Sequence, residues 1–113
     1  MREIRQDQYQ VTYDPATATV VCTGSFRLHD QEYASMVKIL HEAADAGYDT
    51  LTLDVRGLRF LNSSGINVLS KFVLRLRQQR SQLVIKGSDQ HPWQRKSLKN
   101  LERLLPGVRL ELE

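Results

Sequence analysis

The sequence predicts an α/β fold with a four- to five-stranded mixed sheet, an N-terminal hairpin and three to four helices packed against the sheet. Two observations support this prediction. Apolar and polar residues alternate near the start of the chain, and later apolar residues recur at helical spacing between short β-branched runs. Strands separated by helices favour parallel pairing with right-handed crossovers. A chain of 113 residues suits one domain, which we place at residues 1–113.

The first two predicted strands form a hairpin. Residues 9–13 alternate between apolar and polar, residues 14–17 include turn-forming Asp and Pro, and the β-branched run 19–25 follows. Helical spacing begins at Asp30, which suits an N-cap, and Gly47 ends this helix. Its apolar stripe comprises Tyr33, Met36, Val37, Leu40, Ala43 and Ala44.

The remaining elements alternate between strands and helices. The clearest amphipathic helix begins at residue 63, and Pro92 suits the first turn of the next helix. In order, we expect a strand at 50–55, a helix from 63, a short buried strand at 83–85, a helix from Pro92 that ends at Pro106-Gly107, and a strand at 108–112.

Composition excludes several classes of protein. The chain is 41% hydrophobic and 26% charged, which is ordinary for a globular protein and not for a disordered one. Its apolar runs fall far short of the roughly 20 residues that cross a bilayer, and the N-terminus lacks the apolar core of a signal peptide. The single cysteine, Cys22, cannot form an internal disulfide. We therefore expect a cytoplasmic protein with no membrane contact.

Charge is distributed unevenly along the chain. Residues 1–54 hold four basic and nine acidic side chains, whereas residues 55–113 hold twelve basic and four acidic ones. The basic half could meet phosphates or an acidic protein surface. Alternatively, these side chains are the solvated faces of two helices, because no aromatic residues are interleaved with them as base-stacking platforms would require. We therefore expect no nucleic-acid partner.

The usual catalytic signatures are missing from the sequence. It has no Gly-rich phosphate loop, and its three histidines are scattered away from metal-ligand spacing. The two serines at positions 63 and 64 lack the preceding glycine of a hydrolase nucleophile elbow. Asp54 ends a strand, where it either serves a site or only caps the following turn. We expect no catalytic residue, no cofactor and no metal.

One junction, residues 51–66, combines a buried strand, a turn at Gly57 and small polar residues at the start of the amphipathic helix. The side-chain oxygen of Asn62 or Ser63 can act as the N-cap by accepting from a free backbone N–H of the first turn. Local chemistry leaves two interpretations open. The segment either only starts a helix and has no function, or it presents a serine hydroxyl to another molecule.

This junction resembles the signature of the STAS domain family, the anti-sigma factor antagonists and the related domains of anion transporters. In that family a strand ending in Asp leads through a turn with Gly, an apolar residue and Phe into Asp-Ser-Ser-Gly or Asp-Ser-Thr-Gly, followed by an apolar helix. The resemblance extends more weakly over residues 9–112, and it implies an N-terminal hairpin followed by alternating helices and strands. The matching positions are Asp54, Gly57, Phe60, Ser63, Ser64, Gly65, Ile66 and Leu69.

The resemblance implies a binding site without catalytic activity. In the antagonists the first serine of the pair is phosphorylated by a partner kinase that is also the anti-sigma factor, which by position implies Ser63. Ser64 is the alternative acceptor. The usual Asp before the serines is Asn62 here, so one negative charge beside the hydroxyl is missing. The expected partner-binding residues are Arg56, Gly57, Arg59, Asn62, Ser63, Ser64 and Gly65.

A phosphate on Ser63 would act through its charge and not through refolding. It carries about −1.5 to −2 charges, and the positive end of the helix tolerates them. Burying such a group unpaired in an interface costs enough free energy to prevent docking. Arg56 and Arg59 either partly compensate the phosphate or only make the turn more soluble.

The sequence therefore predicts a partner-switching regulator that docks on a serine kinase or anti-sigma factor and is reset by a phosphatase. Two other interpretations stay open. The chain could be a constitutive scaffold or a homodimerisation module, assembled through its oppositely charged halves. It could also be a small enzyme or nucleotide binder that uses Asp54 and the serine loop.

Overall fold

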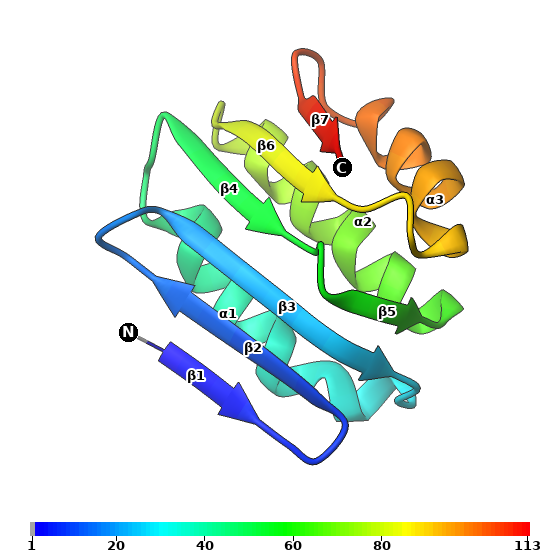
Figure 1. The fold of residues 1–113 in the computed structure, drawn as a ribbon. Helices are drawn as coiled ribbons and strands as arrows, with labels where there is room; N and C mark the ends of the chain where they lie inside the picture. Colours follow the sequence, from blue (N-terminus) through cyan, green and yellow to red (C-terminus); the bar gives the residue numbers. More distant parts are fainter. Residues whose placement is uncertain (1) are drawn as a thin grey trace.

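The computed structural model describes residues 2–113, which form one seven-stranded sheet with the helices on one side of it (Figure 1). The helices are the short 3-10 helix η1 (Asp30–Tyr33) and the α-helices α1 (Ala34–Asp45), α2 (Ser63–Gln78) and α3 (Pro92–Glu102). The strands are β1 (Arg2–Arg5), β2 (Tyr9–Asp14), β3 (Thr19–Phe26), β4 (Thr50–Asp54), β5 (Leu58–Leu61), β6 (Gln82–Gly87) and β7 (Arg109–Leu112).

The sheet is mixed, with strand order β1-β2-β3-β4-β6-β7. β1, β2 and β3 pair antiparallel, whereas β3–β4, β4–β6 and β6–β7 pair parallel. β5 continues beyond the end of β4 and pairs parallel with the last part of β3. The predicted N-terminal hairpin is thus β2–β3, and the parallel pairing expected for strands joined through helices is confirmed.

The predicted four to five strands undercount the sheet. β1 was missed because its sequence, Arg-Glu-Ile-Arg, has one apolar residue and therefore no alternation to detect. β5 was treated as part of the connection into α2, because its four residues follow a turn directly. Asp30 also differs from its predicted role: it begins η1, and α1 starts one turn later at Ala34.

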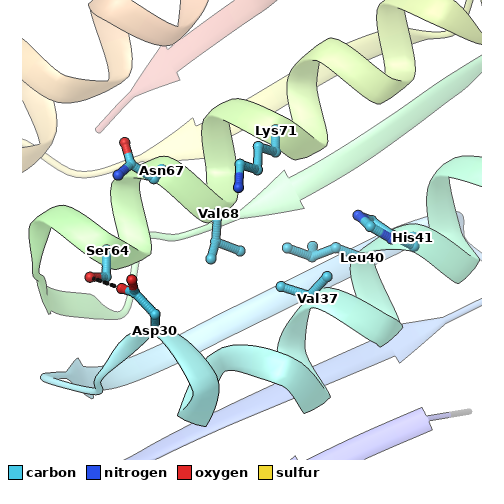
Figure 2. Close-up of a pocket in the computed structure, with 8 residues that line it drawn as sticks. All are labelled: Asp30, Val37, Leu40, His41, Ser64, Asn67, Val68 and Lys71. Carbon is cyan, nitrogen blue, oxygen red and sulfur yellow. Dashed lines mark hydrogen bonds between the residues drawn. The ribbon is translucent and has the colours of Figure 1, made fainter.

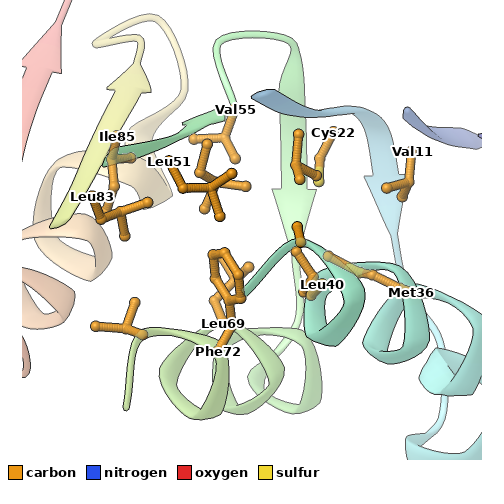
Figure 3. Packing of buried hydrophobic residues seen from close by; sticks show 14 of the residues in the cluster. Val11, Cys22, Met36, Leu40, Leu51, Val55, Leu69, Phe72, Leu83 and Ile85 are labelled. Carbon is orange, nitrogen blue, oxygen red and sulfur yellow. The ribbon is translucent and has the colours of Figure 1, made fainter. Parts of the chain in front are cut away.

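The core lies between the sheet and the three α-helices. Alternate residues of β3 and β4 are buried toward the helices, as the strict alternation of exposure along β3 shows. Leu51 and Ile85 of the sheet meet Leu69 and Phe72 of α2 in this layer (Figure 3). Cys22 lies in the same layer with no solvent exposure, and burial raises the pKa of its thiol to about 12. The thiol is therefore a packing residue and stays protonated at neutral pH.

The opposite face of the sheet is covered by no helix of the described residues (Figure 1). Its side chains are short and mostly polar, and neighbouring strands hold them half-buried. They include Gln10, Thr12, Val21, Thr23 and Thr52. Val84, which pairs with Thr52 on the same face, is buried.

Candidate functional site at the start of helix α2

Asn62 is the N-cap of α2 and joins three segments of the chain. Its side-chain Oδ1 accepts hydrogen bonds from the backbone N–H of Gly65 at 3.0 Å and from the Tyr33 hydroxyl at 2.6 Å. Its Nδ2 donates to the backbone carbonyl of Leu28 at 2.7 Å. The amide thus satisfies a free N–H of the helix and also ties α2 to η1 and to the loop before it.

Gly65 permits this arrangement because it leaves no side chain between α2 and η1. A Cβ at this position would lie 2.2 Å from Leu61 Cδ1 and 2.6 Å from the Tyr33 hydroxyl oxygen. Both distances are too short for non-bonded atoms, so a larger residue would push Tyr33 away from Asn62. The glycine in the serine motif is therefore explained by close packing.

The two serines after Asn62 differ in their surroundings. Ser63 is the first residue of α2 and is exposed, and within residues 2–113 its hydroxyl makes no side-chain hydrogen bond. The Ser64 hydroxyl is half-buried and donates to the Asp30 carboxylate at 2.5 Å. Of these two serines, Ser63 has a hydroxyl that is free to react, whereas the Ser64 hydroxyl must first give up its hydrogen bond to Asp30.

A groove of about 330 Å³ runs beside Ser64 between α1 and α2 (Figure 2). The Ser64–Asp30 pair closes one end, and Lys71 and His41 lie at the other end. The aliphatic residues on its floor are Val37, Leu40 and Val68.

His41 contributes little positive charge to this groove at neutral pH. Burial and the nearby Arg75 guanidinium lower the pKa of His41, and the Asp45 carboxylate only partly opposes them. Asp45 itself is occupied by Arg75, with which it forms hydrogen bonds of 2.7 and 2.8 Å. Lys71 is therefore the cation of the groove.

The predicted arginine turn lies at the far end of β5 from the serines. Arg56 and Gly57 precede β5, whereas Asn62 follows it. The Arg56 guanidinium is already paired with the Asp54 carboxylate at 2.7 Å and with Glu113 at 3.0 Å. These contacts raise the pKa of Arg56. The positive charge of Arg56 is therefore already neutralised by these two carboxylates.

Arg59 also faces away from the serines. With Gly57 it lines a shallow depression formed by the turn between β1 and β2 and by neighbouring residues of β2 and β3. The structure therefore brings Asn62, Ser63, Ser64 and Gly65 together but places the arginine turn and Arg59 in separate surroundings.

Helix α3 holds the β4–β5 turn through a buried amide that sequence reasoning missed. Gln94 is fully buried; its Nε2 donates to the carbonyls of Val55 and Leu58, and its Oε1 accepts from the backbone N–H of Ser88. The indole N–H of Trp93 also donates to the Leu58 carbonyl, at 3.0 Å. No sequence signal marks Gln94, because its partners are backbone groups, and those of Val55 and Leu58 lie more than 30 positions away.

Among residues 2–113, no three His, Cys, Asp or Glu side chains gather closely enough to hold a metal ion. None of the helices in the same part of the chain has the length and apolar character needed to cross a membrane.

The fold and the serines at the start of a helix define a class of protein domain. The STAS domain model matches residues 19–106. The chain therefore belongs to the STAS domain family, which confirms the resemblance seen in its sequence. No curated protein matches the sequence.

Solved structures show the same fold over nearly the whole chain. A chain in the crystal structure of the diguanylate cyclase SiaD with its activator SiaC, from Pseudomonas aeruginosa, aligns with a TM-score of 0.77 and 15% identity, covering 99% of this chain and 98% of that one. Apo-SiaC from the same organism aligns with a TM-score of 0.73 and 13% identity, covering 100% of this chain and 99% of that one. An anti-sigma factor antagonist from Mycobacterium paratuberculosis aligns with a TM-score of 0.67 and 14% identity, covering 95% of this chain and 88% of that one.

Proposed function

We propose that this protein is a cytoplasmic, non-enzymatic regulator that docks reversibly on a serine kinase or anti-sigma factor and is released by phosphorylation of Ser63. The observation that supports this function best is the exposed Ser63 hydroxyl at the start of α2. The next residue, Ser64, lines a groove that a partner could fill. The similar solved proteins also act on partners: SiaC is the activator of a cyclase, and another is an anti-sigma factor antagonist.

The surroundings of the serines favour Ser63 over Ser64 as the acceptor. A kinase can reach the Ser63 hydroxyl directly, because it is exposed. Phosphorylation of Ser64 would first break its hydrogen bond to Asp30 and would then place a phosphate against a carboxylate. Repulsion between these like charges would destabilise the start of α2.

A phosphate on Ser63 is compatible with the fold. Free N–H groups and the positive end of the α2 dipole lie next to it, so its charge is locally favourable. A partner that covers Ser63 would have to bury that charge without a matching cation, because Arg56 is already paired with Asp54 and Glu113. We therefore expect phosphorylation to block docking while leaving the domain folded.

The contacts of Asn62 explain why an amide can stand where the family usually has an acid. Its Nδ2 donates to the Leu28 carbonyl, a contact that an ionised carboxylate cannot make. The Oδ1 of Asn62 still caps the helix through Gly65. We infer that the substitution preserves the geometry of the acceptor serine, and that the kinase does not require a negative charge at this position.

The test combines mass spectrometry of the protein isolated from its host with capture of its partner by wild type, Ser63→Ala and Ser63→Asp. We expect phosphate on Ser63, capture by wild type and Ser63→Ala, and a loss of at least about tenfold for Ser63→Asp, since about 1.4 kcal/mol corresponds to tenfold. Gln78→Glu is the matched control, because it adds a negative charge to an exposed position of α2 that does not line the groove. Equal capture by all variants would exclude the switch and favour a constitutive scaffold.

A further inference from the structure

We propose that the groove between α1 and α2 receives a partner segment that carries an apolar side chain next to an acidic one. The inference rests on the proposed function and adds the chemistry of the partner to it. The acidic side chain pairs with Lys71, and the apolar side chain lies over the valines between the two helices (Figure 2).

The floor of the groove is suited to one aliphatic side chain. Val37 on α1 and Val68 on α2 are half-buried, so solvent still reaches part of their apolar surface, whereas Leu40 between them is fully buried. The close-up shows these three side chains converging from the two facing helices (Figure 2). Covering them with a Leu- or Met-sized group removes apolar surface from water, which is favourable.

The two ends of the groove carry opposite charges that differ in availability. At one end the Asp30 carboxylate accepts a hydrogen bond from Ser64. At the other end Lys71 is exposed, and within residues 2–113 it forms no ion pair. The neighbouring guanidinium, Arg75, is already bound to Asp45. Lys71 is therefore the charge that an occupant can neutralise, and that occupant must be anionic at this end.

This polarity also orients the segment with respect to the phosphorylation site. Lys71 lies seven residues after Ser64 on α2, or about 10 Å along the helix axis at 1.5 Å per residue. An acidic group at Lys71 is kept away from Asp30, whose charge repels it. A phosphate added at Ser63 places further negative charge at the same end as Asp30, which disfavours the acidic segment through repulsion as well as desolvation.

The inference can be tested on the intact protein with defined peptides. The probes are three terminally blocked, Ala-based peptides of about 18 residues, a length at which such sequences form helices in water. Each contains one Leu and, one helical turn away, a Glu, a Gln or a Lys. Titration of the ¹⁵N-labelled protein, followed by backbone amide NMR, reports both where each peptide binds and its dissociation constant.

We expect shifts at the amides around Val37, Val68 and Lys71, with the Glu peptide binding about threefold or more tighter than the Gln peptide and the Lys peptide weakest. Lys71→Glu should reverse the order, so that the Lys peptide binds best. Lys99→Glu, which alters an exposed cation on α3, is the matched control and should leave the order unchanged. Val68→Asn should weaken all three peptides together.

Shifts confined to another surface would overturn the inference, as would an order of affinities unaffected by Lys71→Glu. The amide spectrum of each variant shows directly whether it is folded, and Lys71 is exposed, so its replacement leaves the core intact. None of these measurements involves phosphate on Ser63. A failure here therefore rejects the acidic segment alone, whereas equal partner capture by the Ser63 variants rejects the switch alone.

Discussion

The hydroxyl of Tyr33 donates a 2.6 Å hydrogen bond to Oδ1 of Asn62, although the two residues belong to different helical segments. Tyr33 is fully buried, and burial raises its pKa to about 12, so the hydroxyl remains a donor throughout the physiological range. The contact fixes the start of α2, and therefore the direction of Ser63, against the segment that precedes α1.

Tyr33→Phe should destabilise the protein by about 1 kcal/mol, the usual net loss for one hydrogen bond. Unfolding in urea measures this difference. Tyr9→Phe is the matched control, because Tyr9 also packs on Phe26 but its hydroxyl makes no hydrogen bond within residues 2–113. Equal losses for the two variants would mean that the Tyr33–Asn62 contact does not contribute to stability.

Gly65→Ala should destabilise the protein by about 1–3 kcal/mol, as overpacking of a filled site does. In most helix positions the same change is stabilising by about 1 kcal/mol. The sign is reversed here because the new methyl would meet Leu61 and the Tyr33 hydroxyl. Asn67→Ala, at an exposed position of α2, is the control and should be neutral or slightly stabilising. A Gly65→Ala protein as stable as wild type in urea would contradict the packing argument.

Asp54→Asn should cost about 1 kcal/mol or less at pH 7, as expected for a partly exposed ion pair. Burial raises the pKa of Asp54, but hydrogen bonds from the Arg56 guanidinium and backbone N–H outweigh it and leave the pKa lower than in the unfolded chain. The ionised carboxylate thus stabilises the fold above about pH 4, the unfolded value, and this contribution is lost as the pH falls through the lower folded value.

The difference in unfolding free energy between wild type and Asp54→Asn should therefore shrink as the pH is lowered from 7 toward 3. Glu111→Gln is the control, because Glu111 pairs with Arg109 on the more exposed strand β7 and should have a smaller effect at every pH. A difference for Asp54→Asn that is independent of pH would show that the charge of the carboxylate is not what stabilises this turn.

Gln94→Met should lower the melting temperature by roughly 10 °C, which corresponds to about 2–3 kcal/mol in a domain of this size. The substitution removes three hydrogen bonds from Gln94 to buried backbone groups. The Val55 carbonyl still accepts from the Leu58 N–H and the Leu58 carbonyl still accepts from Trp93, but the Ser88 N–H loses its partner. Calorimetry measures the shift. Gln90→Met, on the exposed loop before α3, serves as the control and should change the melting temperature little.

Sequence reasoning predicted the elements whose hydrophobic pattern is strong. The alternation at residues 9–13 predicted β2, and the helical spacing from residue 63 predicted α2 with its cap at Asn62 or Ser63, of which the structure selects Asn62. β1 was missed because three of its four side chains are charged, so its pairing with β2 leaves little trace in the apolar pattern.

The candidate site could be predicted only where its residues are adjacent in the chain. Asn62, Ser63, Ser64 and Gly65 form one run, and capping chemistry plus family resemblance locate them. Asp30 was predicted to cap a helix, whereas its side chain accepts a hydrogen bond from Ser64. This contact spans 34 positions, and no spacing rule connects the two residues. Lys71 belonged to a stripe of solvated cations in the sequence, and only the packing of α1 against α2 shows that it borders a groove.

The bare side of the sheet gives the molecule a second broad surface. Threonines and other short side chains there face away from every helix of the described residues. A protein seated over α1 and α2 would leave this side uncovered, because the full thickness of the domain separates the two. Simultaneous attachment of the domain to two different bodies, one on each side, is therefore sterically allowed.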